Sequence, residues 1–232
     1  MKNRIRTALV LTLAAIPSVA FAQDEPAKGA YGVVRAGVAI DTDARFPAND
    51  TTAPATIQRN TDHKPGFTGE LGMGYDFGAF RLEGTAGYAT AKLDSPRASA
   101  GGFVTNGRTK AFTLGLSGYL DIETGSAVTP YVGAGIGASR VDMRSSRLGG
   151  TPSAGSRFDD KDWGLNWHAD AGVGIAAGRS TTIDIGARYS RTSKLEFDGR
   201  TGLVTGTPPA LADTFRPRLS SWSAMIGLRQ AF

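Results

Sequence analysis

His168 and Asp170 lie two residues apart, and imidazole and carboxylate groups are the side chains that enzymes most often use as general acids and bases. In an extended strand, residues two apart point to the same side, so both groups would share one face. Acyl transfer would also need a nucleophile, and no serine in the sequence is a convincing partner for His168 or for His63, the only other histidine. We therefore interpret His168 as a hydrogen-bonded residue of a polar interior and predict no catalytic residues.

Metal and cofactor sites receive little support from the sequence. The run Asp159–Asp162 (DDKD) offers carboxylates of the kind that bind divalent cations, but Lys161 in its middle favours a solvated loop. The stretch Gly172–Gly178 resembles a phosphate-binding glycine turn, yet it precedes another strand-like segment, whereas a phosphate site needs a helix N-terminus. The chain has no cysteine, which excludes disulfides and thiolate metal sites. We predict no metal and no cofactor.

The first 22 residues have the composition of a secretory signal peptide. Three cations within the first six residues precede the apolar run ALVLTLAAIPSVA, and Ala20–Ala22 (AFA) fits the small-residue cleavage rule. The apolar run is too short to span ~30 Å of hydrocarbon comfortably, and Pro17 interrupts it, which disfavours a membrane anchor. We predict a signal peptide over 1–22 and a mature, exported chain over 23–232.

The charge is nearly balanced once that segment is removed. The full chain carries a formal charge of +5, and loss of the three cations leaves +2. No basic run or stripe stands out, so a nucleic-acid partner has no support. The 31 glycines recur inside the apolar segments, which argues against a helical bundle because each costs about 1 kcal/mol in a helix.

Eight segments alternate apolar and polar side chains with the period of two that is typical of strands. They cover about 30–41, 66–78, 79–91, 110–123, 128–141, 162–177, 180–193 and 217–232. In the third segment, for example, Phe80, Leu82 and Tyr88 share a face, and Arg81 and Glu83 share the opposite one. Each segment reaches the ~9–11 residues that a membrane strand requires. Aromatic residues lie near the segment ends on the apolar face, as in the interfacial girdles of membrane barrels.

The connections between these segments alternate regularly between long and short. The short ones are FGAF, ETGSAV and AAGRS, and the long polar ones cover 42–65, 92–109, 142–161 and 194–216. This pattern indicates an outer-membrane barrel, whereas a Greek-key sandwich gives no reason for it. A closed ring also pairs every strand edge, as hydrocarbon requires. We predict an all-β fold, an eight-stranded antiparallel transmembrane β-barrel with short periplasmic turns and four long extracellular loops.

The polar face carries charges that would point into the barrel. They belong to Arg35, Glu70, Asp76, Arg81, Glu83, Asp121, His168, Asp170, Asp184, Arg188 and Arg229. The interior of an eight-stranded barrel is just wide enough to be filled by side chains, and buried charges persist only when paired. We predict a lumenal ion-pair network that holds the ring together and plugs it. A narrow water-filled pore stays open as an alternative, because many inward positions are glycine.

The last segment, WSAMIGLRQAF, alternates from Trp222 to a terminal Phe232. It resembles the C-terminal signal that the barrel-assembly machinery recognises in outer-membrane proteins, except that Gln230 stands where an apolar or aromatic residue is usual. The segment Thr129–Val141 (TPYVGAGIGASRV) is similar to one that recurs in the small eight-stranded outer-membrane β-barrel superfamily, of opacity-protein, outer membrane protein A and alphaproteobacterial surface-antigen type. The resemblance covers Gly29–Phe232 and implies a fold and a location in the outer membrane of a Gram-negative bacterium.

Members of that superfamily include adhesins, serum-resistance factors, structural tethers and a few enzymes. The resemblance therefore implies a non-enzymatic surface protein that supports envelope integrity, adhesion or host contact through its loops. Two alternatives stay open: a small porin-like channel, and a lipid A-modifying enzyme, in which His168 would need a serine or aspartate partner.

Arginines in or beside the expected loops indicate a partner for the outer surface. They are Arg97, Arg108, Arg144, Arg147, Arg157, Arg200 and Arg216. Guanidinium groups at that level suit the phosphates of lipopolysaccharide, which they can bind through two parallel hydrogen bonds. The alternative is that these arginines only form part of a generic solvated surface. We expect outer-membrane lipid and lipopolysaccharide, the barrel-assembly machinery and a host surface ligand as partners.

Overall fold

A computed structural model describes residues 28–45, 60–93, 104–148, 155–202 and 211–232. The strands are β1 (Gly29–Arg45), β2 (Asn60–Asp62), β3 (Gly66–Asp76), β4 (Phe80–Lys92), β5 (Val104–Asp121), β6 (Val128–Leu148), β7 (Gly155–Ala176), β8 (Thr181–Ser193), β9 (Phe197–Gly202), β10 (Leu211–Phe215) and β11 (Arg218–Ala231). Within these ranges the chain contains no helix that is long and apolar enough to cross a membrane.

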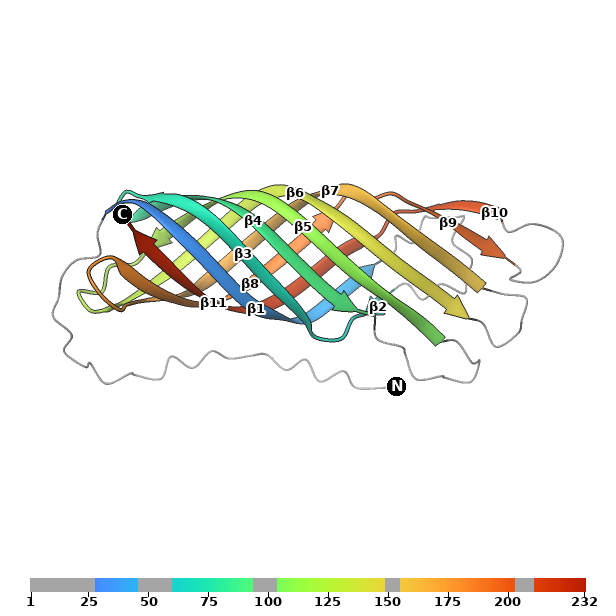
Figure 1. The fold of residues 1–232 in the computed structure, drawn as a ribbon, viewed down its shortest axis with the longest axis horizontal. Coiled ribbons are helices and arrows are strands. Elements are labelled where there is room, and N and C mark those ends of the chain that lie inside the picture. The colour runs from blue at the N-terminus through green and yellow to red at the C-terminus, as the bar shows by residue number, and fades with distance from the viewer. Residues whose placement is uncertain (1–27, 46–59, 94–103, 149–154, 203–210) are drawn as a thin grey trace.

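Eight of the strands form a closed ring in which all neighbours are antiparallel. The order around the ring is β1–β3–β4–β5–β6–β7–β8–β11, and β11 pairs back with β1. The closing pair runs from Tyr31 opposite Ala231 to Arg45 opposite Arg218, and its register shifts once, between Ala39 and Asp41. Figure 1 shows the tilted strands wrapped around a single interior. The predicted eight-stranded antiparallel barrel is confirmed.

The two ends of the barrel differ. At one end, here called the turn end, short connections over 77–79, 122–127 and 177–180 join the strands, and the C-terminus lies beside them (Figure 1). The tightest of these turns contains Gly78, whose φ of 106° suits glycine and whose N–H donates a hydrogen bond to the Asp76 carboxylate at 2.8 Å. At the other end, here called the hairpin end, β5, β6 and β7 extend outward and β9 and β10 add a further hairpin.

Several strands are longer than the sequence predicts. β5 begins at Val104, β6 ends at Leu148 and β7 begins at Gly155, so much of the expected loops over 92–109 and 142–161 is paired strand. The expected loop over 194–216 likewise contains β9 and β10. The prediction is wrong there because the described outward residues Arg108, Lys110 and Arg144 are charged, so the apolar–polar alternation that reveals a lipid-facing strand is lost.

The two faces of the ring differ in chemistry as the alternation predicts. Leu71, Leu116 and Ile136 point outward and are 65%, 70% and 66% exposed. Contiguous exposed apolar surface on this scale is foreign to a soluble monomer and marks contact with a membrane or a partner. A bulge in β1 between Ala39 and Asp41 reverses the parity of that strand, so the residues beyond it that face inward are even-numbered.

Candidate functional site

Arg35 is the centre of an ionic layer, the set of charged side chains that fills the turn half of the interior. Its Nη1 donates a hydrogen bond to Glu70 at 2.8 Å, and both of its terminal nitrogens contact Glu83, with Nη2 2.8 Å from Oε2. The side chains of all three residues are at most 6% exposed. Because Arg35 lies on β1, Glu70 on β3 and Glu83 on β4, one guanidinium group links three strands.

Arg188 extends the ionic layer across the lumen from β8. Its Nη1 donates to Glu70 Oε2 at 2.5 Å, and its Nε donates to Asp170 on β7 at 2.6 Å. Glu70 therefore accepts hydrogen bonds from Arg35 on one side and Arg188 on the other. This chain of ion pairs joins opposite walls of the ring through its centre.

Two further arginines close the layer at the turn end. Arg81 binds Asp121 with two parallel hydrogen bonds of 2.7 and 2.8 Å, the geometry that makes a guanidinium–carboxylate pair strong. Arg229 on β11 lies 3.3 Å from Asp184 and 3.6 Å from Asp76. Every charged residue that the sequence assigns to the lumen thus faces the interior, and the geometry brings them into one connected set.

Aromatic rings occupy the space between these pairs. The hydroxyl of Tyr31 donates to Glu83 at 3.1 Å, and the Arg81 guanidinium lies 4.8 Å from the ring centroid of Tyr119 and 5.4 Å from that of Tyr131. Such cation–π contacts are worth more when water is excluded. The layer contains four arginines (Arg35, Arg81, Arg188, Arg229) and six carboxylates (Glu70, Asp76, Glu83, Asp121, Asp170, Asp184), so its formal charge is negative.

His168 has a serine neighbour that the sequence analysis missed. Its Nε2 lies 2.9 Å from the hydroxyl of Ser117 on β5, and the same Nε2 lies 3.5 Å from Asp170 Oδ2. In a Ser–His–Asp triad the serine and the aspartate contact different ring nitrogens, so that one positions the ring while the other exchanges the proton. Here both contacts use one nitrogen, which does not provide that relay. Only the register of β5 and β7 across β6, which places Gly135 between Ser117 and His168, would have revealed the contact.

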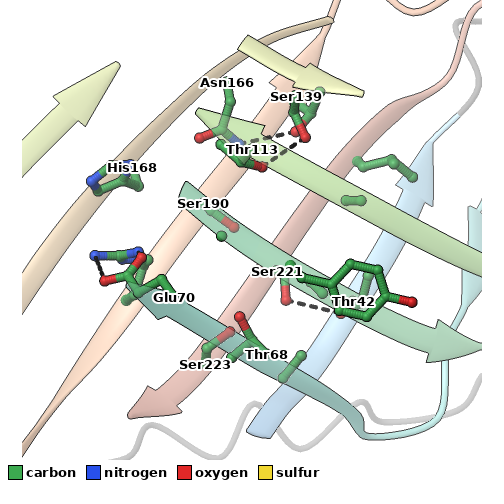
Figure 2. Close-up of a pocket in the computed structure, with 18 of the residues that line it drawn as sticks. Thr42, Thr68, Glu70, Thr113, Ser139, Asn166, His168, Ser190, Ser221 and Ser223 are labelled. Atoms are coloured by element: carbon green, nitrogen blue, oxygen red, sulfur yellow. Dashed lines mark hydrogen bonds and ion pairs between the residues drawn. The ribbon is translucent and has the colours of Figure 1, made fainter. Parts of the chain in front are cut away.

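A hydroxyl-lined cavity of about 140 Å³ lies next to the ionic layer, in the middle of the barrel. Every ring strand except β7 contributes a serine or threonine to its wall, and β7 contributes Asn166. The hydroxyls of Thr42 and Ser221, and of Thr113 and Ser139, are paired at 2.9 Å. Figure 2 shows these side chains converging on one space, with Glu70 and His168 at one side of it. A polar cavity of this size can hold water.

An apolar plug closes the interior on the hairpin side. It consists of Ala44, Leu93, Val141, Met143, Leu195, Phe197 and Leu219, all at most 8% exposed. Leu219 also lines the hydroxyl cavity, so the plug and the cavity are contiguous. This plug was not predicted from the sequence, because five of its seven members lie in stretches interpreted as loops, and Val141 and Leu219 lie at the ends of predicted strands.

Residues 194–198, here called the strap, supply two of the plug residues. Asp162 accepts a hydrogen bond from the backbone N–H of Glu196, and Asp160 accepts one from that of Asp198, each at 2.8 Å. The side chains that alternate with these N–H groups, Leu195 and Phe197, are 1% and 0% exposed. The run DDKD thus fixes the strap, and the described residues contain no group of carboxylates or histidines that could hold a metal ion.

Of the seven arginines predicted to bind lipopolysaccharide, three have described side chains. Arg108 and Arg144 face each other in the β5–β6 ladder, and the side chain of Arg144 lies 3.0 Å from Asp159. Arg216 instead pairs with Glu196 at 2.9 Å. The remaining four lie in strands or outside the described range: Arg147 is in β6, Arg157 in β7 and Arg200 in β9, and Arg97 lies outside the described residues.

Comparisons with known proteins agree with this architecture. The model of the family described as outer membrane protein beta-barrel domain matches residues 7–207. No curated protein matches the chain. Among solved structures, the chain is similar to Neisserial surface protein A, at 20% identity and a TM-score of 0.51, over 88% of this chain and 100% of that one. It is also similar to OprG from Pseudomonas aeruginosa, at 13% identity and a TM-score of 0.47, over 90% and 99%. A third similar structure is Ail of Yersinia pestis, at 13% identity and a TM-score of 0.41, over 88% and 99%.

Proposed function

Since this chain belongs to the outer membrane protein β-barrel domain family, we propose that it is a closed, non-enzymatic surface protein of the Gram-negative outer membrane. In this proposal the barrel anchors the protein in the bilayer, and the hairpin end faces the outside. Short turns on the periplasmic side and longer extracellular connections are the rule for such barrels.

The observation that carries the proposal is the filled interior. The ion pairs from Arg35 through Glu70 to Arg188 and Asp170 run from wall to wall at hydrogen-bond distances. An ion that entered from the turn end would have to separate buried charge pairs whose side chains are at most 14% exposed. Breaking one buried pair costs about 3–5 kcal/mol, so steady conduction through this layer is not expected.

A conductance measurement tests the proposal. Purified wild-type protein in a planar lipid bilayer should show no steady channels. Both barriers must be removed to open a path. The test variant therefore combines Glu70→Ala/Arg188→Ala, which removes the central link of the ionic layer, with Leu195→Ala/Phe197→Ala, which removes two plug side chains, and it should show openings. Those openings should favour cations, because the layer has more carboxylates than arginines. Steady channels from the pure wild-type protein would show that the barrel is a small pore, and the proposal would be abandoned.

The second candidate, a lipid A-modifying enzyme, is favoured by one observation, the contact between Ser117 and His168. Both side chains are buried, at 3% and 5% exposure, and they point into the lumen, whereas an acyl chain would lie on the outer surface of the barrel. Mass spectrometry of lipid A from cells with and without the protein should show identical acyl chains. A lost or added chain that Ser117→Ala abolishes would establish the enzyme instead.

The cellular role in this proposal is envelope integrity, with the hairpin end available for adhesion. A strain that lacks the protein should be more sensitive to detergent and less adherent to host cells, and the gene encoding the closed wild-type barrel should restore both. If the deletion changes neither property, the cellular role is wrong even where the barrel is closed.

A further inference from the structure

A basic patch lies on the outward face of β4–β7 at the hairpin end. Its members, which we call the outer basic patch, are Lys92, Arg108, Lys110, Arg140, Arg144 and Lys161, and all six are exposed. The backbone register places Lys92 opposite Arg108 and Arg108 opposite Arg144, so three cations stand side by side across three strands. In the next row, Lys110 and Lys161 flank Asp142 from either side.

This arrangement is unfavourable for the isolated protein. Residues directly opposite in an antiparallel pair have Cβ atoms about 4.5–5.5 Å apart, and like charges at that distance are destabilising. Two carboxylates lie within the patch, and both already form ion pairs with Arg144: Asp142 at 3.6 Å and Asp159 at 3.0 Å. Lys110 and Arg140 form no ion pair with any described carboxylate. The patch therefore has an excess of positive charge that an anionic partner would relieve.

The position of the patch indicates what that partner is. A row of outward aromatic residues borders it on the side toward the turn end: Tyr88 is opposite Phe112, and Arg140 lies between Phe112 and Trp163. Aromatic rings of membrane proteins concentrate at the headgroup level. Lys110 and Arg108 are two and four residues beyond Phe112 on the same strand, which is about 7 and 14 Å at most at ~3.4 Å per residue. That span covers the layer of headgroup phosphates.

We propose that the outer basic patch binds the phosphates of lipid A, the membrane-embedded part of lipopolysaccharide, in the outer leaflet. Arg140 and Lys110, next to the aromatic row, contact the phosphates nearest the hydrocarbon, and Arg108 and Arg144 contact charges farther out. Arginine suits this role because its planar guanidinium can bind phosphate through two hydrogen bonds. The inference rests on the proposed function, since it requires the hairpin end to face the outer leaflet.

Lipid binding by two matched variants tests the inference. Lys110→Gln/Arg140→Gln removes two charges from the patch. Arg45→Gln/Arg218→Gln removes two exposed charges that are opposite each other in the β1–β11 pair, across the ring from the patch. Full-length mature protein in detergent would be titrated with bis-phosphorylated lipid A, and retention would be followed by native mass spectrometry. We expect about tenfold weaker binding for the patch variant and a change under twofold for the control, since tenfold corresponds to the loss of one good charged contact.

Two further ligands separate the outcomes. Dephosphorylated lipid A should bind the wild-type protein as weakly as bis-phosphorylated lipid A binds the patch variant. Equal binding of dephosphorylated lipid A, or of phosphatidylglycerol, would overturn the inference, as would unchanged binding by the patch variant. The lipid-binding results and the conductance results are independent. If the protein conducts but still prefers phosphorylated lipid A, only the closed-barrel proposal fails. If it does not conduct and shows no such preference, only the lipid site fails.

Discussion

Arg35 and Glu83 meet inside the barrel although their strands, β1 and β4, are not neighbours in the ring. The contact passes over β3, which lies between them, and both guanidinium ends of Arg35 reach the Glu83 carboxylate. A backbone ladder ties each strand only to the next one. Side-chain ion pairs through the centre therefore add a second, independent set of connections that holds the ring at a fixed curvature.

Glu83→Ala should reduce the free energy of unfolding by about 3 kcal/mol. It removes the carboxylate that both terminal nitrogens of Arg35 contact, and it leaves the buried guanidinium with Glu70 at 2.8 Å and Asp184 at 3.8 Å. Urea unfolding in lipid vesicles, followed by tryptophan fluorescence, measures the change. The matched control is Asp159→Asn, which removes a carboxylate from the exposed pair with Arg144 and should cost less than 1 kcal/mol. Equal effects of the two variants would show that the lumenal pair adds no more stability than a surface pair.

Gly135→Ala should destabilise the barrel through a local clash. A Cβ on Gly135 would overlap the ring of His168 and come within 2.6 Å of the Ser117 hydroxyl, so the Ser117–His168 contact must shift. Overpacking of this kind typically costs about 1–3 kcal/mol. Thermal unfolding measures this cost, and the imidazole resonances of His168 should move in the NMR spectrum. The matched control is Gly178→Ala, which should show a smaller loss of stability because that turn glycine meets nothing within 4 Å and has no positive φ.

The strap should loosen when its two acceptors are removed. Asp160→Ala/Asp162→Ala takes away the carboxylates that bind the N–H groups of Glu196 and Asp198. Amide hydrogen exchange at these two positions should become at least tenfold faster, since each lost hydrogen bond is worth about 1 kcal/mol or more and the pair acts on one segment. Exchange in the middle of β4 should not change. Unaltered protection at Glu196 and Asp198 would mean that the plug residues alone hold the strap.

The strands that contact lipid could be predicted from the sequence, and the reason is physical. Leu71 and Glu70 lie on opposite faces of β3, one suited to hydrocarbon and the other to a charged interior. Period-2 alternation is therefore strong wherever hydrocarbon lies outside the barrel and charged side chains lie inside it. The same signal is lost around Arg108, Lys110 and Arg144, because the outward side chains there are charged and the strand is recognisable only by its pairing.

The partners inside the barrel could not be predicted in the same way. Parity assigns Arg35 and Glu83 to the lumen, but which carboxylate an arginine reaches depends on the stagger of the closed ring. The apolar plug was missed for a related reason. Leu195 and Phe197 alternate with polar residues over too short a stretch to stand out from a loop, and their role is visible only once Asp160 and Asp162 are known to lie beside them.

Phe232→Ala should impair assembly while leaving the stability of the assembled barrel almost unchanged. The side chain is 81% exposed at the turn end, so it contributes little packing. The backbone N–H of Phe232 donates to the Ala30 carbonyl at 3.1 Å, and the substitution leaves this donor in place.

Phe77→Ala is the matched control, because Phe77 is also an exposed aromatic residue at the turn end, at 58%. The amount of heat-modifiable barrel in outer-membrane fractions measures assembly, and urea unfolding of the purified protein measures stability. If the terminal ring is a recognition signal, the Phe232 variant should lose most of its assembled barrel and the Phe77 variant should not, with equal unfolding midpoints. Equal assembly of both variants would show that the alternating strand alone is recognised.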